Sequence, residues 1–403
     1  MKILHVTPYF APAWGHGGPV FAVLGLTREL ARQGHEVTVM TTNLDGQGLL
    51  DVPLGRPVDL DGVEVWYFPI QRPRWYAFSR PLARALHEQV GRFDLVHVHT
   101  IFWWPTTVAA FSCRRKKVPY IIGPAGSLSP ICLSKSYERW WVSLSSRTKK
   151  WLYLNTVGNL DLNRASAVHF TAAAEMEAAR PLRLRPPGYV VPLGVELGEA
   201  EAHSGSFPSP QALPQLRGKR MVLFLSRLNP IKGLDRLIEA LGILAARRGD
   251  FVFVIAGSGT RAYEEEVRAL VRRHRLEDRT VFLGFVEGGS KWALLGEADV
   301  FVLSSYHENF GVAVVEAMAA GVPVVISDHV HIHSEVRQAG AGIVTTLDTV
   351  EIAAAIGRLL DDERLRKEMG ERGRRLARER FTWERVAKDM VQVYAEVLKA
   401  GHR

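Results

Sequence analysis

The stretch DVFVLSSYHENFGVAVVEAMAAGVPVVIS (299–327) contains two apolar runs separated by a polar loop and a helical pattern. The runs at 299–305 and 322–327 are rich in valine and isoleucine without strict polar alternation, which is typical of strands buried on both faces. Between them we expect a helix that begins near Val312, directly after Gly311. A strand, a helix and a second strand in this order predict a parallel sheet covered by helices.

The same alternation extends along the whole chain. Further strand-like runs lie at 2–7, 36–42, 63–68, 95–100, 120–123, 167–172 and 189–194, and then at 221–226, 251–257, 280–285 and 342–346. An amphipathic helix is readable at 234–247, where leucine and isoleucine recur at three- and four-residue steps. The pattern predicts an α/β protein of two doubly wound, Rossmann-like domains that face one another across a cleft. Ligands are expected there, at the carboxyl ends of the strands.

The boundary between the two domains is marked by a change in composition. Residues 196–220 lose hydrophobic periodicity and gather glycine, serine and proline. We therefore predict a first domain over 1–195, a linker over 196–218 and a second domain over 219–383.

Bulk composition is that of a soluble globular protein. The chain has 403 residues, 47% of them hydrophobic and 23% charged. Cys113 and Cys132 are too few for a disulfide framework, which favours a reducing cytoplasm. No stretch approaches the roughly 20 apolar residues of a membrane span, and the first apolar run is too short for a signal peptide. The expected location is the cytoplasm, with peripheral attachment to the inner face of the plasma membrane still open.

The net charge of +9 is concentrated in one segment. Residues 111–164 contain ten lysines and arginines against two acidic residues, together with Trp140, Trp141 and Trp151. Basic residues mixed with indoles suit an anionic membrane surface. A solvated basic face with tryptophans in the core fits the same sequence. No nucleic-acid-binding motif accompanies the charge, so a nucleic acid partner is not expected.

A glycine-containing turn follows the first strand. Gly17 and Gly18 let the backbone approach a ligand, and the amides of the helix after them can receive phosphate oxygens. The spacing is not G-x-G-x-x-G, and no acid ends the second strand near 40–42, which disfavours a nicotinamide cofactor. A purely structural turn remains an equal alternative.

Four charged residues stand near predicted strand ends in the second domain. Arg227 and Lys232 follow its first strand, where they can stabilise a departing diphosphate. Glu316 can accept two hydrogen bonds, which suits a ribose diol, and Glu308 can bind sugar hydroxyls. Taken singly, two such cations are usually just solvated, and two such acids are usually a helix cap and a surface acid.

The motifs become specific when they are taken in order. The series GHGG near the start, FLSRLNPIKG, VIAGSG, FLGFV and ADVFVLSSYHENFGVAVVEAMAAGVPVV closely resembles the retaining glycosyltransferases of family 4, which have the GT-B fold. The resemblance covers most of the chain and is strongest over 221–327. It implies that the second domain binds a nucleotide-sugar donor and the first binds the acceptor. It also implies that the last helix, 384–403, packs back onto the first domain.

The resemblance assigns roles to individual residues. Arg227 and Lys232 correspond to the residues that bind the donor diphosphate, and Glu316 to the residue that binds the ribose. Glu308 corresponds to a catalytic residue that contacts the transferred sugar. The remaining expected donor-binding residues are Gly17, Gly18, Gly257, Phe285, Val286, Asn309, Phe310, Gly311 and Val312.

The chain departs from the family pattern at two places. Ala125 stands where many relatives carry a histidine near the reacting sugar, and His99 is the substitute that we predict to be catalytic. A structural histidine fits His99 equally. The loop at 327–342 also differs, and its alternating histidines invite a metal-site interpretation that we do not favour, because no cysteine or acid completes a tetrahedral set. We expect neither a metal nor a resident cofactor.

The predicted reaction is transfer of a hexose from a UDP- or GDP-sugar to a glycan or lipid-linked acceptor, with retention, in assembly of a cell-surface polysaccharide or lipopolysaccharide. No carboxylate stands out as a covalent nucleophile, which favours front-face substitution. Three alternatives stay open at this point: a sugar-nucleotide epimerase, a phosphorylase, and a non-catalytic module that binds nucleotide sugars at a membrane.

Overall fold

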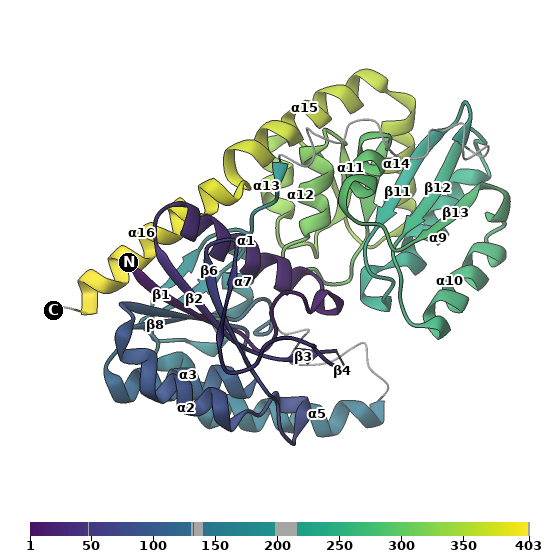
Figure 1. The fold of residues 1–403 in the computed structure, drawn as a ribbon. Coiled ribbons are helices and arrows are strands. Elements are labelled where there is room, and N and C mark those ends of the chain that lie inside the picture. The colour runs from purple at the N-terminus through teal and green to yellow at the C-terminus, as the bar shows by residue number, and fades with distance from the viewer. Residues whose placement is uncertain (47, 130–131, 133–139, 198–215, 402–403) are drawn as a thin grey trace. The chain divides into compact units, whose positions relative to one another are not determined.

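The structure is a computed structural model that describes residues 1–403 except 47, 130–131, 133–139, 198–215 and 402–403 (Figure 1). It divides into two compact units. Unit 1 comprises Met1–Gly194 together with Trp383–Arg403, and unit 2 comprises Val195–Thr382. Most of the predicted linker, 198–215, lies outside the described residues.

Unit 1 is built on an eight-stranded sheet, parallel except at one edge. In sheet order its strands are β10 (Gly188–Val190), β9 (Ala167–Phe170), β8 (Tyr120–Gly123), β7 (Leu95–His99), β1 (Lys2–Val6), β2 (Glu36–Thr42), β6 (Val63–Phe68) and β5 (Pro57–Leu60). Its helices are α1 (Gly18–Arg32), α2 (Arg80–Gln89), α3 (Trp104–Lys116), α5 (Trp140–Asn155), α6 (Val157–Asn163), α7 (Ala173–Ala179) and α16 (Trp383–Gly401).

The two faces of this sheet are buried by different helices, because successive side chains of a strand point to opposite sides. Ile3 of β1 belongs to a core shared with Leu30 of α1 and Tyr394 of α16. Its neighbour Leu4 belongs to a second core, which includes side chains of α2 and α3. Burial on both faces explains the continuous apolar runs in the sequence.

The chain's last helix packs onto unit 1 through the indole ring of its first residue. Trp383, at the start of α16, lies against Gly25 of α1, where an added Cβ would come within 2.1 Å of the indole ring. Tyr394, further along α16, is fully buried. The return of this helix to unit 1 agrees with what the family resemblance implies.

Unit 2 contains a six-stranded, fully parallel sheet. In sheet order its strands are β13 (Thr280–Gly284), β12 (Phe251–Ala256), β11 (Arg220–Leu225), β14 (Val300–Leu303), β15 (Val324–Ser327) and β16 (Gly342–Thr345). Its helices are α9 (Leu234–Ala245), α10 (Arg261–Arg273), α11 (Gly288–Gly296), α12 (Val312–Ala319), α13 (His333–Ala339), α14 (Thr349–Asp361) and α15 (Glu363–Arg380).

The predicted α/β fold with two doubly wound domains is confirmed, and each predicted strand corresponds to one in the structure. The prediction missed β5, which pairs antiparallel to β6, and the short hairpin of β3 (Leu44–Asp45) and β4 (Gly48–Leu49). These edge strands are short and partly exposed, so they lack the apolar run that identifies a central strand. Within the described residues, no helix is both long enough and apolar enough to cross a membrane.

Candidate functional site

The loop after β11 carries Lys232 and is held tightly against the loop after β14. The Asn229 side chain accepts a hydrogen bond from the Ile231 amide and so caps the short 3-10 helix Pro230–Lys232. Gly233 follows at φ 68°, and an added Cβ there would lie 1.8 Å from the Ser304 carbonyl oxygen. Ser304 Oγ donates to the Gly233 carbonyl at 2.7 Å. These contacts fix where the lysine side chain begins.

Lys232 forms an ion pair with Glu308, which belongs to the loop after β14. The two side chains are only 12% and 18% exposed, so solvent screens them less than a surface pair. The backbone of Glu308 is also fixed, because its amide donates to the His329 carbonyl at 3.1 Å and its carbonyl accepts from the His331 amide at 3.0 Å. The structure thus brings together two predicted site residues that lie 76 positions apart.

Arg227 occupies the loop that leads from β11 to Lys232. Its neighbours are held by the loop after β12: the Leu228 amide donates to Ser258 at 2.8 Å, and Gly257 lies so close that an added Cβ would be 1.9 Å from the Ser226 carbonyl oxygen. The Arg227 side chain itself is exposed and has no ion pair to another described residue. The loop therefore presents a guanidinium at the carboxyl edge of the sheet.

The segment from Asn309 to Val312 leads into α12 as predicted. Gly311 is the N-cap residue of this helix, and Val312 is its first residue. Phe310 is buried and packs edge-on against Phe381, with ring centroids 5.7 Å apart. Its side chain therefore belongs to the core, which leaves its backbone as the part that can meet a ligand.

Glu316 of α12 is paired with a residue that the sequence analysis missed. Lys291 of α11 places its Nζ 2.7 Å from Glu316 Oε1, and the two side chains are 22% and 13% exposed. Nothing in the sequence singles out this lysine among 51 lysines and arginines. Its partner is 25 positions away, and only the packing of α11 beside α12 brings the two together.

The predicted edge loop after β13 is open to solvent. Phe285 is 69% exposed, which is unusual for a large apolar side chain, and Val286 is partly buried. An exposed ring at a strand end can stack on a flat group such as a nucleobase. This placement is compatible with the donor-binding role that the family resemblance implies for Phe285.

Of the predicted residues of unit 1, His99 lies at a strand end, and Gly17 and Gly18 lie at the start of a helix. Gly17 is the N-cap of α1 and Gly18 its first residue, which places Pro19 at the second helical position. His99 is the last residue of β7, and its Nε2 lies 2.8 Å from Nδ1 of His5. Ala125 follows β8 with a φ of 50°. The sequence analysis missed His5, because a histidine inside an apolar strand carries no signal of its partner.

Most basic residues of the segment 111–164 whose side chains the structure describes are exposed, and Arg114 and Lys150 are partly buried. Trp151 is 65% exposed and Leu152 is 55% exposed, so the alternative of a buried tryptophan is wrong for Trp151. The side chains of Trp140 and Trp141 lie outside the described residues.

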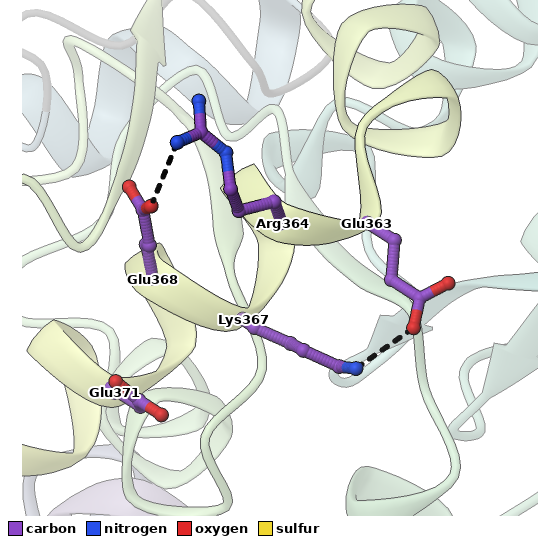
Figure 2. A pocket seen from close by; sticks show the side chains of 5 residues that line it. All are labelled: Glu363, Arg364, Lys367, Glu368 and Glu371. Atoms are coloured by element: carbon purple, nitrogen blue, oxygen red, sulfur yellow. Dashed lines mark ion pairs between the residues drawn. The ribbon is translucent and has the colours of Figure 1, made fainter.

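A small pocket lies along α15, and none of the residues that line it belongs to these loops. It is lined only by charged residues of that helix, among them Glu363 and Lys367, whose ion pair spans 2.8 Å (Figure 2). Such exposed pairs along one helix contribute little energy. The pocket therefore offers no alternative site.

Comparisons with known sequences cover both units. Residues 209–376 match the family described as glycosyl transferases group 1, and residues 17–194 match the glycosyl transferase 4-like domain. An uncharacterized glycosyltransferase of Methanocaldococcus jannaschii is 27% identical over 410 residues, covering 98% of both chains. The GDP-mannose:cellobiosyl-diphosphopolyprenol alpha-mannosyltransferase of Komagataeibacter xylinus is 24% identical, covering 99% of this chain and 94% of the relative.

Solved structures share the fold. The sucrose-phosphate synthase of Thermosynechococcus elongatus aligns with a TM-score of 0.77 at 20% identity, covering 99% of this chain and all of that one. HepE of Anabaena, solved in complex with UDP-glucose, aligns with a TM-score of 0.72 at 22% identity, covering 99% of this chain and all of that one. The chain is therefore a glycosyltransferase of the group 1 family, with the GT-B fold.

Proposed function

We propose that the chain transfers a hexose, with retention, from a nucleoside-diphosphate sugar to a glycan or lipid-linked acceptor. Unit 2 would hold the donor and unit 1 the acceptor. The observation that carries this proposal is the half-buried Lys232–Glu308 pair at the carboxyl ends of adjacent strands, with Arg227 in the same loop as Lys232. The relative from Komagataeibacter xylinus is named for a GDP-mannose donor and a diphosphopolyprenol acceptor, which supports the same two substrate classes.

In the proposed reaction, Arg227 and Lys232 stabilise the diphosphate as it leaves. An ammonium group has three N–H donors, so Lys232 can keep its bond to Glu308 and still bind phosphate oxygens. Glu308 would then orient the lysine and accept hydrogen bonds from the transferred sugar. The leaving phosphate takes the proton of the acceptor hydroxyl in front-face substitution. Positive charge comes from these two side chains, and we propose that no metal ion is needed.

The ribose is assigned to Glu316. Its pair with Lys291 leaves the second carboxylate oxygen available for a ribose hydroxyl and fixes the direction in which the carboxylate points. We therefore add Lys291 to the donor site as a residue that positions Glu316.

We further propose that unit 1 associates with an anionic membrane surface. Trp151 and Leu152 of α5 are exposed, and Lys149 lies with its Nζ 4.8 Å from the exposed ring of Trp75. The exposed basic residues 115–117 end α3, which packs on α6. Apolar side chains next to cations suit the boundary of acidic headgroups. This would bring a lipid-linked acceptor to the enzyme.

The transfer is tested by screening UDP- and GDP-hexoses for thermal stabilisation, and then incubating the stabilising donor with membrane lipid extract. We expect release of the nucleoside diphosphate and a product whose NMR coupling constants show the donor's anomeric configuration. Conversion of the donor without any acceptor would identify an epimerase. Donor binding without release in any extract would identify a binding module.

The membrane association is tested by sedimentation with vesicles. We expect binding to anionic vesicles that falls as salt rises, and weaker binding after Trp151→Ser with Leu152→Ser. Val350→Ser is the matched control, because Val350 is 63% exposed in unit 2 and should not contribute. Binding that is indifferent to vesicle charge would contradict the proposal.

A further inference from the structure

Four histidines lie on one face of the unit 1 sheet. His5 of β1 is in register with His97 of β7, and His99 stands two residues further along the same strand. Gly123 of β8 is in register with His99, and an added Cβ on it would lie 3.4 Å from His97 Nε2 and 3.5 Å from Nδ1 of His169 in β9. A Cβ at this position would already touch both rings, so a larger side chain than that of alanine would keep the imidazoles of β7 and β9 apart.

The proton positions in one half of this cluster follow from a single carbonyl group. His169 Nε2 lies 2.8 Å from the Val191 carbonyl oxygen, which only accepts, so this nitrogen carries a proton. Burial lowers the pKa of His169 to about 4, so the ring is neutral at pH 7 and its Nδ1 has no proton. His97 Nε2, 3.3 Å away, must donate to it. His97 Nδ1 therefore accepts from the Tyr394 hydroxyl at 2.8 Å.

The other half of the cluster is the pair of His5 and His99. His5 Nδ1 lies 2.8 Å from His99 Nε2, while His5 Nε2 is buried without a hydrogen-bond partner among the described residues. If His5 Nε2 carried the proton, a buried N–H would be left unpaired, and such groups are rarer in proteins than unpaired acceptors. The proton of His5 is therefore placed on Nδ1, from which it is donated to His99 Nε2.

We propose that His5 fixes His99 in its Nδ1–H form, so that His99 donates a hydrogen bond to an oxygen atom of the bound substrate and does not act as a base. Its Nε2 is already occupied by His5. Its Nδ1 bonds to no other described residue, and the half-buried ring stands at the carboxyl end of β7. His5 is a positioning residue. The contact between His99 and substrate rests on the proposed transferase function, whereas the proton positions do not.

The same nitrogens raise the question of a metal ion. One ring nitrogen each from His5, His97 and His99 lie within 4.8 Å of one another. Two imidazoles bound to zinc at about 2.0–2.1 Å in tetrahedral geometry have nitrogens about 3.3 Å apart. The 2.8 Å separation of His5 and His99 is that of a hydrogen bond, and both nitrogens of His97 are already bonded. The geometry therefore favours hydrogen bonding over metal coordination.

The proton positions are tested on the full chain without substrate. Histidine-selective nitrogen-15 labelling and long-range proton–nitrogen NMR distinguish Nδ1–H from Nε2–H rings, and single substitutions assign the signals. We expect Nδ1–H for His5 and His99, and Nε2–H for His97 and His169. After His5→Leu the His99 signal should shift towards a mixture of forms, whereas His5→Asn, whose amide can donate from a similar position, should preserve it. An Nε2–H form of His99 in the unmodified chain overturns the proposal.

The contact between His99 and the substrate is tested by the kinetics of variants at position 99. The amide of His99→Asn can donate from near the Nδ1 position and should retain activity within about tenfold, while His99→Gln should lose about a hundredfold. His5→Leu should lower kcat/KM about tenfold, with rescue by His5→Asn and an unchanged melting temperature for the rescued variant. Equal loss in His99→Asn and His99→Gln, or one equivalent of tightly bound metal that disappears in His5→Leu, contradicts the proposal. If no transfer is found with any donor, the NMR result still stands and only the proposed function fails.

Discussion

Unit 1 and unit 2 both present polar groups at the carboxyl ends of parallel strands, but in opposite electrostatic forms. In unit 2 the groups are oppositely charged pairs, Lys232 with Glu308 and Lys291 with Glu316. In unit 1 they are imidazoles kept neutral by burial, for example His5, whose pKa is lowered to about 3. Charged pairs suit a ligand that itself carries charge, such as a diphosphate. A neutral network instead fixes the direction of its hydrogen bonds.

The largest expected effect on activity comes from removing a positive charge from the site in unit 2. Lys232→Ala should lower kcat by about a hundredfold, because removing one donor that stabilises developing negative charge costs about 3 kcal/mol of barrier. Nucleoside diphosphate release at saturating donor measures this. Lys367→Ala is the matched control, since Lys367 pairs with Glu363 on the surface of α15 and its removal should change little. Near-normal turnover of a folded Lys232→Ala protein would refute the assigned role.

Lowering the pH should destabilise unit 1 more than unit 2. Burial lowers the pKa of five histidines in unit 1, namely the four of the cluster and His35, and of His307 and His331 in unit 2. The unfolded chain binds protons near pH 6.5 while the folded units resist them, so this stability is complete above pH 6.5 and is lost as pH falls towards about 4. A histidine that stays neutral in the folded chain costs stability at up to about 1.4 kcal/mol per pH unit well below pH 6.5, so unit 1, which has more of them, should lose more stability than unit 2.

Hydrogen–deuterium exchange at pH 7.0 and 5.5 measures the two units separately. The rates are corrected for the intrinsic effect of pH on exchange. We expect protection of β1, β7 and β9 to fall more than that of β11 and β14. His169→Asn should reduce the difference. Equal losses in both units would contradict the contrast between a neutral and a charged site.

A smaller effect should follow from Lys291→Met in unit 2. Losing the partner of Glu316 should raise the donor KM by about tenfold with kcat nearly unchanged, because the ribose is remote from the reacting carbon. Lys291→Arg should restore most of the affinity. The assignment is sharpened with a 2′-deoxy donor, whose penalty should be present in the unmodified chain and absent in Glu316→Ala. A fall in kcat with KM unchanged would place Lys291 nearer the reaction.

In unit 2, the local sequence pattern predicts the positions of Gly311 before a helix and of Lys232 and Glu308 in strand-end loops. Their expected roles came from the family resemblance. Lys291 was not predictable, because its role depends on two helices packing side by side. The same applies to His5: its position in an apolar strand indicates burial, but only the sheet register places it against His99. Short edge strands such as β5 were missed because they bury too little apolar surface to leave a pattern.

We propose above that Lys232 and Arg227 bind the donor's diphosphate while Glu308 stays beside Lys232. A crystal structure of the chain with the stabilising nucleotide sugar would show whether these contacts form. We expect phosphate oxygens within hydrogen-bonding distance of Lys232 Nζ and the Arg227 guanidinium, with the ribose on Glu316. A diphosphate bound elsewhere, with Lys232 contacting only Glu308, would contradict it.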